Sequence, residues 1–277
     1  KAIVDQMKPK FIKQGQANGH DPQILEKIWS DWEKFASYAF NKSHATCYSW
    51  VAYQTAYLKA HYPAEYMAAL MTRRFSQITE ITKLMEECKA LKIATLGPDV
   101  NESQIGFGVN KHGEIRFGLS AIKGMGASAA ESIVRERMEN GPYKDIYDFA
   151  ERVDLSNVNR KAFESLAYSG GFDSFGLQRE QYFAVTGKGD LFLDTIVRYG
   201  QLFQAEKAQQ QNSLFGGMDA VDVVHPIAPK AEKWPTIEKL NKERELVGIY
   251  LSAHPLDEYS VVLNNMCNTH CSKIGRN

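Results

Sequence analysis

Two glycines on either side of one apolar residue are the strongest chemical signal in this 277-residue chain. Gly124 and Gly126 flank Met125, and a helical pattern begins directly afterwards at Ala127. Glycine lets the backbone approach a phosphate without a Cβ in the way, and the amides that open a helix carry the favourable end of its dipole. The spacing therefore predicts a helix-hairpin-helix turn that grips nucleic acid phosphates without reading base sequence. The residues assigned to this grip are Lys123, Gly124, Met125, Gly126, Ala127 and Ser128.

A second, degenerate copy of this pattern is predicted over residues 160–178, where a helix ends in Ser-Gly-Gly-Phe-Asp. Gly170 is its candidate DNA contact. Residues 116–161 hold eight Lys or Arg against seven Asp or Glu, so backbone amides must supply most of the grip. The structural alternative for both copies is a helix C-cap glycine followed by a tight turn.

A second segment, Phe-Asn-Lys-Ser-His at residues 40–44, stands just before a helix that is expected from Ala45. Asn41 or Ser43 can cap this helix, which places Lys42 and His44 where a helix N-terminus would meet an anion such as a triphosphate. His44 and Tyr48 are four residues apart and so share one helix face. The alternative is an exposed helix cap without a ligand.

A third segment, Gln-Asn-Ser-Leu-Phe at residues 211–215, lies in a stretch of Gln, Gly and Pro that reads as a linker. A Gln three residues before a Leu-Phe pair, with no core nearby, is typical of a short docking peptide. Burying Leu214 and Phe215 in a partner would contribute roughly 3–6 kcal/mol before the cost of ordering the segment. The alternative is that these two side chains fold back on the parent domain.

Neither a metal site nor a catalytic group is predicted for this chain. Cys267, His270 and Cys271 are three possible metal ligands without a fourth nearby in sequence. No Asp-x-Asp pair occurs in an alternating strand pattern.

The elements that must hold these segments are mainly helical. The apolar period changes from helical to two only over residues 107–117, where Lys-His-Gly at 111–113 marks a hairpin turn. We therefore expect a mainly α fold with a small β-hairpin, in which four helices precede residue 95. Helical periodicity is expected at residues 25–35, 44–60, 63–71, 76–91, 127–138, 160–168 and 178–210.

Composition excludes several protein classes. The chain is 44% hydrophobic and balances 33 basic against 33 acidic residues, which excludes disorder and any overall field that would steer it toward nucleic acid or lipid. No run approaches the ~18 apolar residues of a membrane span, and the start lacks the pattern of a signal peptide. Four cysteines are too few for a disulfide scaffold. We expect a cytoplasmic protein without a membrane partner, and a first residue other than Met suggests a piece of a longer chain.

These motifs, read together, resemble one protein family over nearly the whole chain. The segments at 35–48, 53–67, 97–101, 118–126, 159–161, 169–173, 211–215 and 248–255 stand in the order found in bacterial DNA polymerase III alpha subunits, the family C replicative DNA polymerases. The Phe-Asn-Lys-Ser-His block is the most specific of these segments.

This resemblance implies roles for each segment. Fingers that close over the incoming deoxynucleotide would use Asn41, Lys42, Ser43, His44 and Tyr48. The helix-hairpin-helix region would grip the template-primer duplex. The peptide with Gln211, Ser213, Leu214 and Phe215 would insert into the sliding clamp, although Asn212 departs from the residue that the family often has there.

The resemblance also implies what the chain lacks. The intact parent would be a DNA-directed DNA polymerase, a nucleotidyltransferase that also meets other replisome subunits. Its palm carboxylates, which hold Mg²⁺, would lie before Lys1. The fragment would carry no cofactor and would be inactive alone.

The expected divisions are residues 1–95 as the later fingers, 96–210 as the hairpin with tandem helix-hairpin-helix motifs, 211–245 as clamp peptide and linker, and 246–277 as a connector toward an oligonucleotide-binding domain. One alternative is a free-standing helix-hairpin-helix DNA-binding module of a repair protein. A third interpretation is a helical interaction protein whose glycine hairpin only turns the chain.

Overall fold

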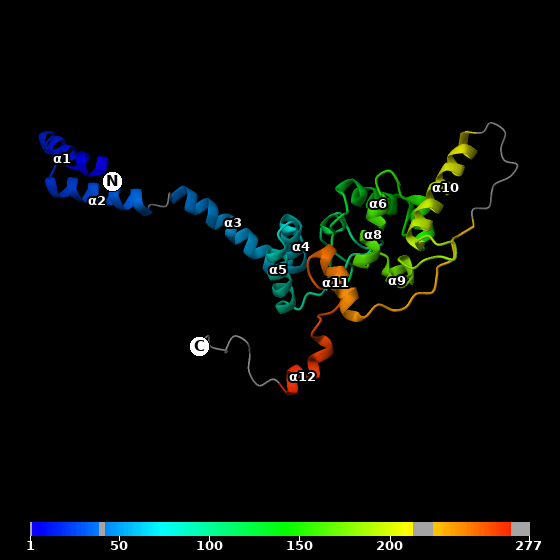
Figure 1. Ribbon diagram of the computed structural model, residues 1–277. Coiled ribbons are helices and arrows are strands. Elements are labelled where there is room, and N and C mark those ends of the chain that lie inside the picture. The colour runs from blue at the N-terminus through cyan, green and yellow to red at the C-terminus, as the bar shows by residue number, and fades with distance from the viewer. Residues whose placement is uncertain (1, 39–41, 213–223, 267–277) are drawn as a thin grey trace. The chain divides into compact units, whose positions relative to one another are not determined.

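A computed structural model describes residues 2–38, 42–212 and 224–266 (Figure 1). The chain divides between His61 and Tyr62 into two compact units, here called the N-terminal unit and the C-terminal unit. The C-terminal unit includes α4 (Pro63–Arg74) and α5 (Ile78–Ala90), which pack against its small sheet. The predicted division into fingers and later domains stays a prediction.

The N-terminal unit holds three helices, α1 (Ala2–Ala17), α2 (Pro22–Tyr38) and α3 (Lys42–His61). The first two pack against each other. The Asp21 carboxylate accepts a hydrogen bond of 2.7 Å from the Gln23 amide and so caps the start of α2. Sequence reasoning counted four helices before residue 95 and omitted α1, so the described residues hold five there.

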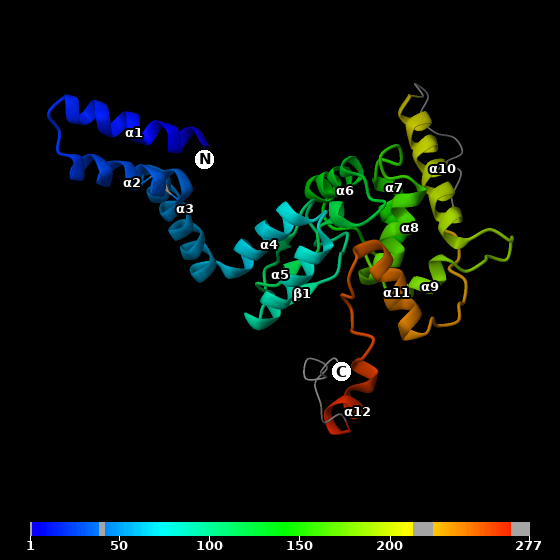
Figure 2. The ribbon, with the colours of Figure 1, turned by 60° about the vertical axis from the view of Figure 1, so that its left-hand side comes forward.

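The C-terminal unit is mainly helical and includes one small sheet (Figure 2). In both views α11 lies beside α8, and α10 packs on α7 and α8. Its further helices in chain order are α6 (Ala127–Asn140), α7 (Ile146–Arg152), α8 (Arg160–Ser169), α9 (Arg179–Tyr182), α10 (Phe192–Asn212), α11 (Thr236–Val247) and α12 (Ser260–Asn265), with the short 3-10 helices η1 (Leu119–Ala121), η2 (Asp173–Phe175) and η3 (Asp257–Tyr259).

The sheet has three strands in the order β1-β3-β2. The antiparallel pair of β2 (Gly108–Val109) and β3 (Ile115–Arg116) is the predicted hairpin, and Gly113 supplies the positive φ of 79° that its turn requires. Sequence reasoning missed β1 (Thr95–Leu96), which pairs in parallel with β3, because two residues are too few to show a strand period.

Aromatic rings form the centre of the C-terminal unit. Phe149, Phe163 and Phe172 are fully buried, and Phe149 meets the other two rings edge to face at centroid distances of 5.3 and 5.1 Å. These three rings come from α7, from α8 and from the turn after α8. The core therefore holds both predicted hairpin copies in one body.

The predicted fold class, mainly α with a small β-hairpin, is confirmed. Helix α7 was missed: it is only seven residues long, and Asp145 starts it by accepting from the amides of Tyr147 and Asp148. The expected helix over 178–210 is two helices separated by a short bridge between Val185 and Leu191. No described helix is long and apolar enough to cross a membrane.

Candidate nucleic-acid interface

The glycine turn that follows β3, here called the hairpin of residues 123–128, has buried apolar residues and exposed glycines. Leu119, Ile122 and Met125 are buried, whereas Gly124 and Gly126 are exposed. Gly124 has a φ of 90°, a conformation that L side chains rarely adopt. The Met125 amide donates to the Ile122 carbonyl at 3.0 Å and closes the turn. The apolar side chains thus anchor a turn whose backbone faces solvent.

Helix α6 begins directly after this turn with open amides. No side chain caps the helix at Gly126, and the amides of a first helical turn have no partner within the helix. Ala127 and Ser128 in that first turn are exposed. Every residue of the predicted phosphate-binding segment from Lys123 to Ser128 except Met125 is therefore exposed.

Two contacts fix the back of the hairpin. The Lys123 amide donates to the Leu246 carbonyl at 2.9 Å, and the Ser165 hydroxyl donates to the Lys123 carbonyl at 3.1 Å. Leu246 belongs to α11 and Ser165 to α8, so two helices distant in sequence hold the turn. A preorganised turn of this kind loses little conformational entropy when it binds.

Half of the eight basic side chains between residues 116 and 161 are committed to the fold. Arg116 pairs with Glu102, Arg160 pairs with Asp194 at 2.8 Å, and Arg137 is buried, where it donates to the Val100 carbonyl at 2.7 Å. Arg152 is the fourth basic side chain that is committed to the fold. The other four are exposed and have no ion pair with a described residue; they are Lys123, Arg135, Lys144 and Lys161.

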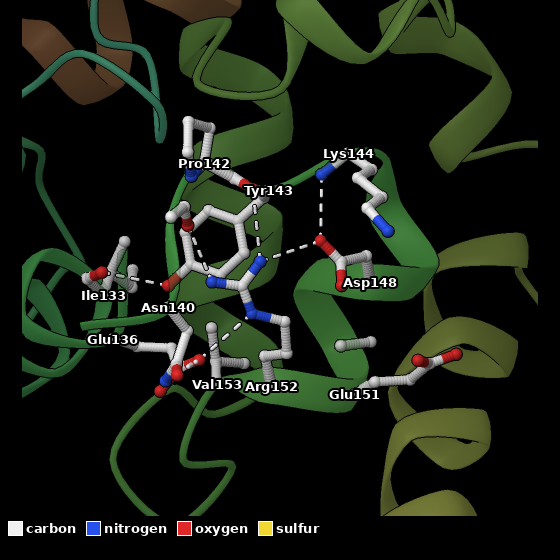
Figure 3. Close-up of polar contacts among 12 residues, drawn as sticks. Ile133, Glu136, Asn140, Pro142, Tyr143, Lys144, Asp148, Glu151, Arg152 and Val153 are labelled. Carbon is white, nitrogen blue, oxygen red and sulfur yellow. Dashed lines mark hydrogen bonds and ion pairs between the residues drawn. The ribbon is translucent and has the colours of Figure 1, made fainter. Parts of the chain in front are cut away.

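Arg152 ties the end of α6 to α7 (Figure 3). Its guanidinium donates to the Glu136 carboxylate at 3.0 Å, to the Asp148 carboxylate at 2.9 Å and to the Gly141 carbonyl at 2.7 Å. It also lies 4.6 Å from the ring centroid of Tyr143, whose hydroxyl donates to the Ile133 carbonyl. Burial raises the pKa of Tyr143 above its ordinary value. This arginine supports the fold and has few donors left for a ligand.

The second predicted turn, at the end of α8, is closed where the first is open. Gly170 has a φ of 90° but is buried, and its amide donates to the Leu166 carbonyl as the helix C-cap. A Cβ at this position would stand 2.7 Å from Arg179 Cζ. The contact of Gly170 with DNA stays a prediction, and its one amide is already used inside the protein.

Arg179 closes this turn through a network that sequence reasoning missed. Its guanidinium donates to Asp173 at 2.6 Å and to Glu243 at 3.1 Å, and the Glu243 carboxylate also accepts from the amides of Leu251 and Ser252. Arg179 and Glu243 are 5% and 1% exposed at their side chains. Burial lowers the pKa of Arg179, but the hydrogen bonds and charges of Asp173 and Glu243 outweigh that effect and raise it. These residues are 64 positions apart, so no local pattern could have paired them.

Comparison with known proteins supports the family assignment made from the sequence. Residues 92–182 match a family described as helix-hairpin-helix motif. The chain is 36% identical over 271 residues to the DNA polymerase III subunit alpha of Xylella fastidiosa, 38% over 250 residues to that of Vibrio cholerae, and 41% over 253 residues to that of Chlamydia trachomatis. These matches cover 96%, 90% and 90% of this chain.

The chain is homologous to one segment of DNA polymerase III alpha subunits. It spans 20–22% of the length of these three relatives. The resemblance inferred from the sequence is thereby confirmed, as is the presence of a helix-hairpin-helix region. None of the three relatives named is a free-standing repair module.

The residues that the likeness to DNA polymerase III alpha subunits assigns to the nucleotide lie at the start of α3. Lys42, Ser43, His44 and Tyr48 are exposed, and the rings of His44 and Tyr48 lie 4.2 Å apart between centroids. The expected shared face of these two residues is therefore confirmed. Asn41 lies outside the described residues, so contact of the group with a nucleotide stays a prediction.

The predicted clamp peptide falls largely outside the described part of the chain. Gln211 belongs to the last turn of α10, and Ser213, Leu214 and Phe215 lie beyond the described residues, as do Cys267, His270 and Cys271. Within residues 2–38, 42–212 and 224–266, no group of three His, Cys, Asp or Glu could hold a metal ion.

Proposed function

We propose that this chain binds double-stranded DNA through the hairpin of residues 123–128 and contributes that grip to a DNA-directed DNA polymerase. The open, uncapped start of α6 next to an exposed glycine turn is the observation that carries the proposal. Backbone amides there can donate to phosphate oxygens on any DNA sequence, because they contact no base edge. The homology to DNA polymerase III alpha subunits supports a template-primer duplex as the partner.

The charge around the hairpin suits this role. Lys123 is exposed at the turn, and Arg135 is exposed on α6, two turns beyond its start. Neither has an ion pair with a described residue, so each can release a counterion from a phosphate. The chain as a whole is neutral, which makes the predicted affinity local to this face and strongly dependent on salt.

Other steps of polymerisation would use other parts of this chain or lie outside it. Lys42, Ser43, His44 and Tyr48, with Asn41, would face the incoming deoxynucleotide, and Gln211 with residues 213–215 would bind the sliding clamp. Mg²⁺ and the carboxylates of phosphoryl transfer would lie outside this chain, which would not polymerise DNA alone. Other replisome subunits would meet the intact parent. The family resemblance supports each of these assignments.

A substitution at Gly126 tests the DNA grip without disturbing the fold. A Cβ there would meet only Ser128 Oγ, at 3.8 Å, and the backbone has an ordinary φ of −76°. Gly126→Val should therefore keep the fold, with a loss of about 1 kcal/mol or less in the free energy of unfolding, because valine is a poorer N-cap residue than glycine. Its side chain would hold a phosphate away from the amides, and loss of such bonds to a charged group, about 1.5–3 kcal/mol, weakens binding by about tenfold or more.

Fluorescence anisotropy with a labelled DNA duplex at low salt measures this effect. Gly187→Val is the matched control, because a Cβ at Gly187 meets nothing within 4 Å and Gly187 lies in the turn between α9 and α10. Equal affinity of the Gly126 variant and the wild type would rule out the hairpin as the contact. Undetectable binding by the wild type would rule out the proposed function.

A further inference from the structure

A groove of about 380 Å³ lies against the hairpin on the side of α8 and α11. Its walls come from the hairpin, from α8 and from α11, and it is lined by Lys123, Gly124, Lys161, Glu164, Ser165, Tyr168, Lys242, Glu245 and Leu246. Three separate elements therefore contribute one lysine each. Sequence spacing could not indicate this convergence, since the three lysines span 119 positions.

Lys161, from α8, packs against the proposed phosphate-binding turn. A Cβ at Gly124 would stand 3.3 Å from Lys161 Cε, which places the lysine stem directly against the glycine. Lys161 is exposed and has no ion pair with a described residue. Its neighbour Glu164, which also lines the groove, pairs with Arg160 at 2.5 Å, and Arg160 pairs with Asp194 as well.

Lys242 is held in place by aromatic rings. Its ammonium lies 4.9 Å from the ring centroid of Tyr168 and 4.8 Å from that of Trp234, and it pairs with Glu238 at 3.6 Å. Tyr168 in turn stacks on Phe183 at a centroid distance of 3.8 Å. The ring cluster thus holds the Lys242 cation at the lining of the groove, because cation–π attraction favours one position of the ammonium group.

We propose that this groove is a second contact for the sugar–phosphate backbone of duplex DNA, in which Lys161 and Lys242 bind phosphates next to the one held by the hairpin amides. The groove and the hairpin share Lys123 and Gly124, so a strand on one surface reaches the other. Successive phosphates of one strand advance only about 3.4 Å along the duplex axis. This inference rests on the proposed function and assigns two contacts to it that the hairpin motif does not supply.

Salt dependence separates a lost phosphate contact from general weakening. Each phosphate contact contributes about 0.9 to the slope of log affinity against log salt concentration. Lys161→Gln keeps the side chain as far as Cγ, which also lies near Gly124, and removes the charge, so its slope should fall by about 0.9 between roughly 50 and 200 mM salt. Lys242→Gln should lower the slope by a similar amount, and the double variant by about twice as much. Lys161→Arg, which keeps the charge, should restore the wild-type slope.

Lys188→Gln is the matched control, because Lys188 is exposed on the turn between α9 and α10, outside the groove. Its slope should equal that of the wild type. Duplex binding that is sensitive to Gly126→Val but unchanged in slope by both Lys161→Gln and Lys242→Gln would overturn this inference and leave the proposed function intact. Loss of wild-type duplex binding would instead remove the proposed function.

A competition arm identifies the source of the phosphate. Inorganic phosphate and a deoxynucleoside triphosphate, each at matched ionic strength, should not displace the duplex from the wild type more than from the Lys161→Gln variant. Selective displacement from the wild type would show that the groove holds free phosphate compounds, and would overturn the assignment to DNA.

Discussion

The two glycine turns of the C-terminal unit share a sequence pattern and differ in what their glycines do. Gly124 has a φ of 90° in an exposed turn, and Gly170 has the same φ in a buried one. The helix that follows the first turn begins without a side-chain cap, whereas the Arg179 guanidinium covers the second turn, where a Cβ at Gly170 would stand 2.7 Å from Arg179 Cζ. A glycine pattern therefore indicates a backbone conformation, and the charged side chains around it decide whether that backbone can meet a ligand.

Removal of the buried carboxylate at the closed turn should have the largest effect. Glu243→Ala leaves the buried Arg179 without one partner and leaves the amides of Leu251 and Ser252 unsatisfied. Loss of one partner of a buried ion pair typically costs about 3–5 kcal/mol, and we expect a loss of that size in the free energy of unfolding by urea. A loss below about 1 kcal/mol would mean that the network adds little to stability.

A methyl group at the closed turn should cost less but still destabilise. Gly170→Ala forces a side chain into positive φ and against Arg179, with an expected loss of about 1–3 kcal/mol. Gly126→Ala, at the open turn, should lower the free energy of unfolding by less than about 1 kcal/mol, because the φ of −76° suits alanine although alanine is a poorer N-cap residue than glycine. Equal losses at both positions would show that the two turns do not differ as the structure indicates.

Removal of a buried hydroxyl next to the closed turn should increase the stability of the protein. Tyr182 is 1% exposed, and its hydroxyl has no hydrogen-bond partner among the described residues. Because an unsatisfied buried polar group costs about 1–3 kcal/mol, Tyr182→Phe should raise the free energy of unfolding by about 1 kcal/mol. An unchanged or lower value in urea unfolding at neutral pH would argue against an unsatisfied hydroxyl.

The stability difference between Tyr182→Phe and the wild type should depend on pH. Burial raises the pKa of Tyr182 above its ordinary value of 10.0. The folded protein thus holds this proton more tightly than the unfolded chain, so the resulting stability is complete below pH about 10 and is lost as the pH rises further. The stability advantage of Tyr182→Phe should therefore widen above pH about 10, and a constant difference would contradict the shift.

Removal of a charge at the open turn should hardly change stability but should clearly change DNA binding. Lys123→Gln removes an exposed charge while its backbone contacts to Leu246 and Ser165 persist. We expect the salt slope of duplex binding to fall by about 0.9, with an unfolding free energy within about 0.5 kcal/mol of the wild type. An unchanged slope would show that the Lys123 side chain does not contact a phosphate.

Sequence reasoning located the open turn because its information is local. The glycine spacing, the buried Met125 between the glycines and the helix start at Ala127 all lie within a few residues. The same local logic identified the β-hairpin through the turn at Gly113. Periodicity and turn chemistry act over short distances, so they predict elements well.

The closed turn and the groove could not be predicted in this way. Arg179 meets Glu243 only because α11 packs on α8, and Lys242 joins Lys161 for the same reason. Local pattern also assigned residues 211–245 to linker, although Thr236–Val247 forms α11. Polar and proline-rich surroundings hid a helix whose buried side is provided by another helix.

The attachment of α11 has a consequence for dividing this protein into pieces. The matched motif ends at residue 182, yet Glu243 and the Leu246 carbonyl, which complete its two turns, lie more than 60 positions later. A shortened chain that stops at the motif boundary would expose Arg179 and would leave Ser165 as the only one of the two contacts at the back of the hairpin. A piece of this region that folds on its own should therefore be longer than the motif and extend at least to Ser252.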